Sequence, residues 1–186
     1  FSSFPAFSSF PSFPVFPSLQ DHYRSHSKPY QNQLPDRIPV ERAAVVDELT
    51  TSIAHAHSRG LTPVVFTSRA ELRFASTAER LAFGEAVSAT LMDVVKRLPQ
   101  TLGFLISKGG ITSNDVLSTG LELTASRVLG QILPGVTVVQ TPPWHRLPQL
   151  PVVIFPGNVG GDGALAEAYR RLAPSHTQAS RAKLAA

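Results

Sequence analysis

Two stretches of the chain place apolar side chains on one face of a helix. Residues three or four positions apart share a helical face, and the first such stripe consists of Val45, Leu49, Ile53 and Ala56. Gly60 follows it and is a typical helix stop. The second stripe consists of Phe83, Val87, Leu91, Val94 and Leu98. It follows Ser76-Thr-Ala-Glu79, a capping box in which the serine and glutamate side chains satisfy free amides at a helix start.

Short apolar runs bounded by Gly or Pro predict the strands of a sheet. They cover residues 63–67, 102–107, 128–133, 136–140 and 151–155, and Pro134-Gly135 forms a turn between two of them. A final helix is predicted to bury Leu165, Ala168, Tyr169 and Leu172. Because helices and strands alternate, we expect an α/β fold. The predicted architecture is a layered, Rossmann-like domain with a largely parallel or mixed sheet and helices on both faces.

The first 40 residues differ in composition from the rest of the chain. They hold seven of the 16 Pro and six of the 11 Phe, and the Phe recur at every third position from Phe1 to Phe16. A period of three matches polyproline II rather than a helical stripe or an alternating strand. We therefore expect residues 1–40 to form a disordered tail, with a Phe-rich binding tail as the functional alternative. Residues 41–186 are expected to form the folded domain.

Composition excludes several classes of protein. The chain has no Cys, which excludes a disulfide scaffold and a thiolate metal site and fits a reducing, cytoplasmic location. A net charge of +4 over 186 residues is not the dense basic surface of a nucleic-acid binder. The longest apolar run, residues 151–155, is far shorter than the roughly 18–20 residues that span a bilayer. We expect neither a nucleic-acid partner nor a membrane partner.

The first glycine loop reads Ser-Lys-Gly-Gly-Ile-Thr-Ser-Asn-Asp over residues 107–115. Gly109 and Gly110 allow a ligand to approach the backbone closely, and Thr112 and Ser113 offer hydroxyls that can cap the following helix. Free amides at a helix start favour phosphate. The spacing matches neither a Walker A loop nor a dinucleotide-binding fingerprint. The alternative is an ordinary strand-to-helix turn, with Lys108 as a solvated residue at the strand end.

The second glycine loop, residues 155–163, holds four Gly within its last seven positions, which is more than a simple turn needs. Loops at the carboxyl ends of strands in an open α/β sheet share one crevice, where ligands bind. If the two preceding strands are parallel neighbours, both loops face a single nucleotide. Asp115 and Asp162 are then candidates to meet a magnesium ion directly or through water. The alternative is that each aspartate is a helix-start charge.

Three ordered segments, residues 104–115, 127–136 and 153–160, resemble the C-terminal nucleotide-binding domain of the four-carbon acid sugar kinases. The resemblance runs from about Leu61 to Leu172 and implies that the domain binds ATP with Mg²⁺. It places Gly109, Gly110, Ile111 and Thr112 at the phosphate loop, and Gly157, Asn158 and Gly160 at a second nucleotide-contacting loop. Together with Ser113, these are the predicted cofactor-binding residues. No catalytic residue and no protein metal ligand is assigned.

The Lys-Gly-Gly-Ile-Thr-Ser form of the loop resembles one branch of that family, in which some members are fused to dehydrogenase or aldolase modules. Many members carry Glu where this chain has Ile111 and Gly where it has Asn114. The resemblance implies transfer of the terminal phosphate of ATP to the 4-hydroxyl of a four-carbon acid sugar of the threonate, erythronate or 3-oxo-tetronate type. A non-catalytic α/β module that binds a nucleotide or a partner is the alternative function.

In that family, a separate N-terminal domain binds the acid sugar and supplies the acceptor site. This domain and the first strand of the nucleotide-binding domain have no counterpart in the sequence, which starts with Phe rather than Met. We therefore expect the chain to be a fragment of a larger kinase. The expected partners are a nucleotide and, through the N-terminal domain, the acid sugar. A homodimer is left open.

Overall fold

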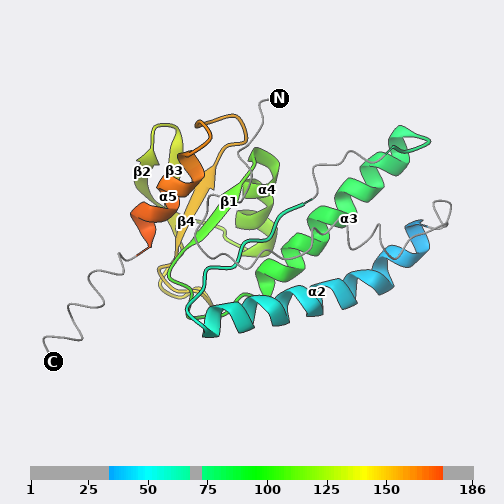
Figure 1. Cartoon of the computed structure of the whole chain (residues 1–186), viewed down its shortest axis with the longest axis horizontal. Helices are drawn as coiled ribbons and strands as arrows, with labels where there is room; N and C mark the ends of the chain where they lie inside the picture. The colour runs from blue at the N-terminus through cyan, green and yellow to red at the C-terminus, as the bar shows by residue number, and fades with distance from the viewer. Residues whose placement is uncertain (1–33, 68–72, 174–186) are drawn as a thin grey trace, which may run out of the picture. The chain divides into compact units, whose positions relative to one another are not determined.

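The structure, a computed structural model, describes residues 34–67 and 73–173, with side chains from residue 42 onward (Figure 1). The described residues form two compact units. We call residues 100–118 and 122–173 the sheet unit, and residues 34–67, 73–99 and 119–121 the helical unit. The Phe repeat and the rest of residues 1–33 lie outside the described residues, so the tail remains a prediction.

Four strands form one mixed sheet in the sheet unit. They are β1 (Leu105–Lys108), β2 (Arg127–Leu133), β3 (Val136–Gln140) and β4 (Pro151–Phe155), in the order β1-β4-β3-β2. Only β1 and β4 are parallel, whereas β3 pairs antiparallel with both β4 and β2. The α/β fold is confirmed, and its sheet is the mixed form rather than the largely parallel one. The ten-residue connection 141–150 holds no helix and is shorter than the crossover that parallel neighbours need.

Two short helices lie on opposite faces of this sheet. Side chains alternate between the faces of a strand, so Ile106 and Ser107 of β1 point in opposite directions. Ser107 contacts α4 (Gly110–Asp115), which continues as the π-helix η3 (Val116–Gly120), and Ile106 packs in the same cluster as residues of α5 (Ala164–Leu172). The expected helices on both faces are therefore present in this unit.

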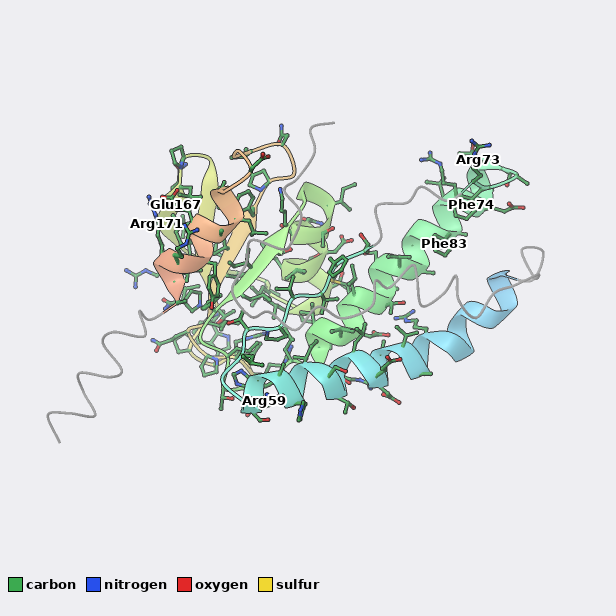
Figure 2. The ribbon with its side chains drawn as sticks, in the orientation of Figure 1. Arg59, Arg73, Phe74, Phe83, Glu167 and Arg171 are labelled. Carbon is green, nitrogen blue, oxygen red and sulfur yellow. The ribbon has the colours of Figure 1, made fainter. Side chains whose placement is uncertain are left out.

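The core of the sheet unit lies between the sheet and α5. It contains Leu133, Val136, Val138, Val153, Phe155 and Ala168, each at most 9% exposed. Removing a side chain such as that of Phe155 from water contributes about 1.5–3 kcal/mol. Arg171 of α5 donates to the carbonyl oxygen of Ile132 at 2.6 Å. It also donates to the carboxylate of Glu167 at 2.5 Å, and Figure 2 labels both of these side chains. Although it is exposed, the Arg171 side chain therefore ties α5 to β2.

The helical unit contains α2 (Leu34–Ser58) and α3 (Thr77–Lys96). Both predicted stripes are confirmed: Val45, Val46, Leu49, Ile53, Phe83, Val87 and Val94 form one buried cluster. Outside it, Arg42 pairs with Asp93. The Phe74 and Phe83 rings lie 5.3 Å apart between centroids (Figure 2). No helix among the described residues is long and apolar enough to cross a membrane.

Two local predictions in the helical unit need correction. The expected strand at residues 63–67 is wrong, because only Val64 forms an isolated bridge and no ladder extends from it. A short, mainly apolar run favours a strand only when a neighbouring strand supplies paired backbone groups. In addition, α2 begins at Leu34, within the segment 1–40 that we expected to be disordered. The capping box is confirmed, since the Glu79 amide donates to Ser76 Oγ at 3.2 Å.

Candidate functional site

The two glycine loops start side by side. Strands β1 and β4 are parallel neighbours with Lys108 opposite Phe155, so both chains leave the sheet at the same edge. The Gly109 amide donates to the Phe155 carbonyl oxygen at 2.9 Å. A Cβ atom placed on Gly157 would lie 3.9 Å from the Gly109 Cα atom. A shared site required that the two preceding strands be parallel neighbours, and β1 and β4 meet this requirement.

The first loop turns sharply at Gly109 into α4. Its φ of +116° lies in a region that side chains other than glycine rarely adopt, and a Cβ there would meet Thr112 Oγ1 at 3.3 Å. Gly109 is the N-cap of α4 and no side chain caps this end, so the expected hydroxyl cap is not formed. The first helical hydrogen bond runs from the Ser113 amide to the Gly109 carbonyl oxygen. Helix geometry therefore leaves the amides of residues 110–112 without helical partners.

Side chains of the first loop divide into an outer and an inner set. A Cβ atom placed on Gly110 would have no atom within 4 Å of it, and the Ile111 side chain is 82% exposed. Thr112 is half-buried. Ser113 is buried, and its hydroxyl donates to the Ser107 carbonyl oxygen at 3.1 Å. The outer residues face solvent at the sheet edge, whereas the Ser113 side chain packs α4 against β1.

Gly157 and Asn158 are exposed in the second loop. The loop then turns toward α5 at Gly160. Gly160 has a φ of +82°, and a Cβ there would lie 2.5 Å from the Ala164 Cβ atom. This residue is therefore required by the close approach of the loop to the start of α5. Gly157 and Asn158 have no such packing constraint and are open to a ligand.

Lys108 connects the two loops. Its Nζ atom lies 3.3 Å from the Pro156 carbonyl oxygen, 3.4 Å from that of Gly157 and 4.7 Å from the centre of the Phe155 ring. Partial burial lowers the pKa of the Lys108 ammonium from its ordinary value of 10.5. The alternative of a solvated residue at the strand end is therefore incomplete: Lys108 does end β1, but it is half-buried and its ammonium contacts protein carbonyls. The parallel register, which brings the 155–157 backbone beside Lys108, cannot be read from local sequence.

The two aspartates occupy different positions. Asp115 is the last residue of α4, so its reading as a helix-start charge is wrong. Asp162 is exposed and directly precedes Gly163, the N-cap of α5, which agrees with that reading. Within the described ranges, no group of three or more His, Cys, Asp or Glu residues could hold a metal ion. The contacts described above between the two loops are made by backbone groups and by Lys108.

Comparison with known proteins gives one family match. Residues 22–165 match the family described as the nucleotide-binding C-terminal domain. This match covers both glycine loops as far as the first residues of α5. No curated protein matches the chain.

Two solved structures are similar in fold. Both are crystal forms of a domain of unknown function (DUF1537) from Bordetella bronchiseptica, with bound citrate and as a domain-swapped dimer. In one form the identity is 20% and the TM-score 0.50, over 66% of this chain and 30% of that one. In the other the values are 19% and 0.46, over 63% and 28%. The chain thus spans less than a third of the length of these structures.

Proposed function

Since the chain belongs to the family of nucleotide-binding C-terminal domains, we propose that its sheet unit binds ATP between the two glycine loops. One observation carries the proposal: both loops leave the carboxyl ends of the parallel strands β1 and β4, where their backbones approach each other. This edge of an α/β sheet is where ligands bind in related architectures. We further propose that the bound ATP is the phosphoryl donor of a four-carbon acid sugar kinase.

The residues of the loops suit a polyphosphate. The amides of residues 110–112 have no helical partner, and an anion at such a helix start accepts from them. Gly110, Gly157 and Asn158 leave the backbone uncovered, so phosphate oxygens can approach it. Mg²⁺ needs few protein ligands because it coordinates nucleotide phosphates. We propose that the carboxylate of Asp162, which is exposed in the second loop, contacts this Mg²⁺ ion through water.

Phosphoryl transfer to an acid sugar also needs an acceptor site and a base. We assign both to another domain of a longer protein, in keeping with the small share of the DUF1537 structures that this chain spans. The nucleotide-binding domain would then contribute positioning of the donor phosphate and electrostatic stabilisation of the transferred group. We expect the chain alone to phosphorylate neither erythronate nor threonate. Turnover of either substrate would contradict this division of labour.

Titration of Mg-ADP against the purified chain, followed by thermal melting, tests nucleotide binding. A ligand at 100 times its Kd stabilises a folded protein by about 2.7 kcal/mol, so the melting temperature should rise with nucleotide concentration. The diagnostic variant is Gly110→Val, because no atom lies within 4 Å of the added Cβ and the fold should persist. Its side chain would occupy the space of the phosphates and should abolish the stabilisation.

Gly103→Val is the matched control. Gly103 also has open space around it, but it precedes β1 and lies at the other end of that strand from the loops. This variant should keep the full response to Mg-ADP. If the unsubstituted chain shows no stabilisation at millimolar nucleotide, or if Gly110→Val responds like the unsubstituted chain, the loop assignment is wrong.

A further inference from the structure

Lys108 holds two successive carbonyl groups of the second glycine loop. Its ammonium lies within hydrogen-bond distance of the carbonyl oxygens of Pro156 and Gly157, at 3.3 and 3.4 Å. It also lies 4.7 Å from the centre of the Phe155 ring, a distance at which a cation is attracted to the ring face. The residue before the first glycine loop therefore restrains the start of the second loop.

This contact determines where the amides of the second loop point. A trans peptide unit is planar, and its N–H and C=O bonds are directed oppositely. The carbonyls of Pro156 and Gly157 face Lys108, so the amides of Gly157 and Asn158 face away from it. Neither amide donates to another of the described residues. Successive N–H groups directed to one side form a concavity that binds anions.

We propose that Lys108 is a positioning residue of the nucleotide site, which turns the Gly157 and Asn158 amides toward a phosphate group by holding the carbonyls behind them. The ligand class of this cradle is the polyphosphate of a nucleotide, and the assignment rests on the proposed ATP site. Partial burial, which lowers the pKa of the ammonium, fits a group that is directed at protein carbonyls rather than at water. Lys108 acts through the loop and is not a catalytic residue.

The test compares Lys108→Met, Lys108→Arg and the control Arg170→Met in the full chain. Lys108→Met keeps an unbranched apolar stem and removes the donors, whereas Lys108→Arg keeps a charged donor. Arg170 is an exposed cation in the last turn of α5, at the end of that helix farther from the second loop. Calorimetric titration with Mg-ADP measures Kd. Amide ¹H–¹⁵N spectra report the environment of Gly157 and Asn158 with and without nucleotide.

We expect the Kd of Lys108→Met for Mg-ADP to be about tenfold higher or more, because the variant loses hydrogen bonds donated by a charged group. Lys108→Arg should recover most of the affinity, and Arg170→Met should bind like the unsubstituted chain. In nucleotide-free protein, Lys108→Met should already shift the amide signals of Gly157 and Asn158. This last change separates positioning from a direct contact between Lys108 and phosphate.

Each contrary result overturns a defined part of the argument. If the unsubstituted chain binds Mg-ADP and Lys108→Met binds it equally well, the role of Lys108 is refuted and the ATP site stands. Weaker binding without a change in the free Gly157 and Asn158 amides also refutes positioning. If the unsubstituted chain binds no nucleotide, both proposals fail. Should Lys108→Met not fold, Lys108→Arg decides, because a donor of different shape must still shift the Gly157 and Asn158 amide signals in nucleotide-free protein if Lys108 positions them.

Discussion

Replacement of Gly160 by alanine should destabilise the sheet unit more than any neighbouring glycine substitution. Gly160 closes the second loop with a φ of +82°, where an L side chain is strained by about 1–2 kcal/mol. The added Cβ atom would also lie 2.5 Å from Ala164 Cβ and 3.4 Å from Phe155 Cζ. Overpacking of this kind costs about 1–3 kcal/mol. The free energy of unfolding should therefore fall by about 2–5 kcal/mol.

The neighbouring Gly161 provides the matched control. It lies in the same loop, its φ is outside the left-handed region, and nothing lies within 4 Å of an added Cβ. Gly161→Ala should change the free energy of unfolding by no more than about 0.5 kcal/mol, as expected for an unconstrained surface position. Gly160→Ala and Gly161→Ala each add one methyl group to the second loop. Only the methyl group at position 160 lies against α5.

Urea unfolding followed by far-ultraviolet circular dichroism measures both free energies. A lower midpoint with an unchanged slope identifies a loss of stability, whereas a changed slope identifies a change in compactness. Unfolding of Gly160→Ala and Gly161→Ala at the same urea concentration would refute the backbone strain at Gly160 and the clash with Ala164. That outcome would mean that the second loop does not approach α5 as the structure shows.

Two further predictions concern other positions in the sheet unit. The buried Thr141 hydroxyl accepts from the Leu150 amide at 2.8 Å and donates to the Leu147 carbonyl oxygen. Thr141→Val should therefore lower the free energy of unfolding by about 1–3 kcal/mol. A urea unfolding curve equal to that of the unsubstituted chain would contradict this prediction. Burial lowers the pKa of Lys108 in the folded state below 10.5, so the unfolded chain binds more protons in the window between the two values. The melting temperature of the unsubstituted chain, relative to that of Lys108→Met, should accordingly rise as the pH approaches 10.5. A difference that stays flat or falls would contradict the burial of Lys108.

Local patterns predicted the elements that are stabilised by their own spacing. The stripe at Val45, Leu49 and Ile53 forms a buried helical face because a period near 3.6 is a property of the helix itself. The capping box and the hairpin turn at Pro134-Gly135 form for the same reason, since each depends on residues within a few positions of one another. The apolar run 151–155 became β4 with unchanged bounds.

The features that local patterns missed depend on partners distant in sequence. Residues 63–67 have the composition of a strand but only a single bridge, because a ladder needs a neighbouring strand. Lys108 looked like a solvated strand end until the parallel register placed it beside the backbone of Pro156 and Gly157. Arg171, similarly, reaches the carbonyl oxygen of Ile132 from 39 positions away.

The sequence by itself determined the α/β class, both glycine loops and the buried faces of the helices, because periodicity and turn chemistry act over a few residues. Only the tertiary structure decided that β1 and β4 are the parallel pair and that the loops following them adjoin. It also decided which loop residues serve packing, such as Ser113 and Gly160, and which leave the backbone open. Strand pairing joins groups dozens of positions apart, and its register is set by the burial of a whole sheet face.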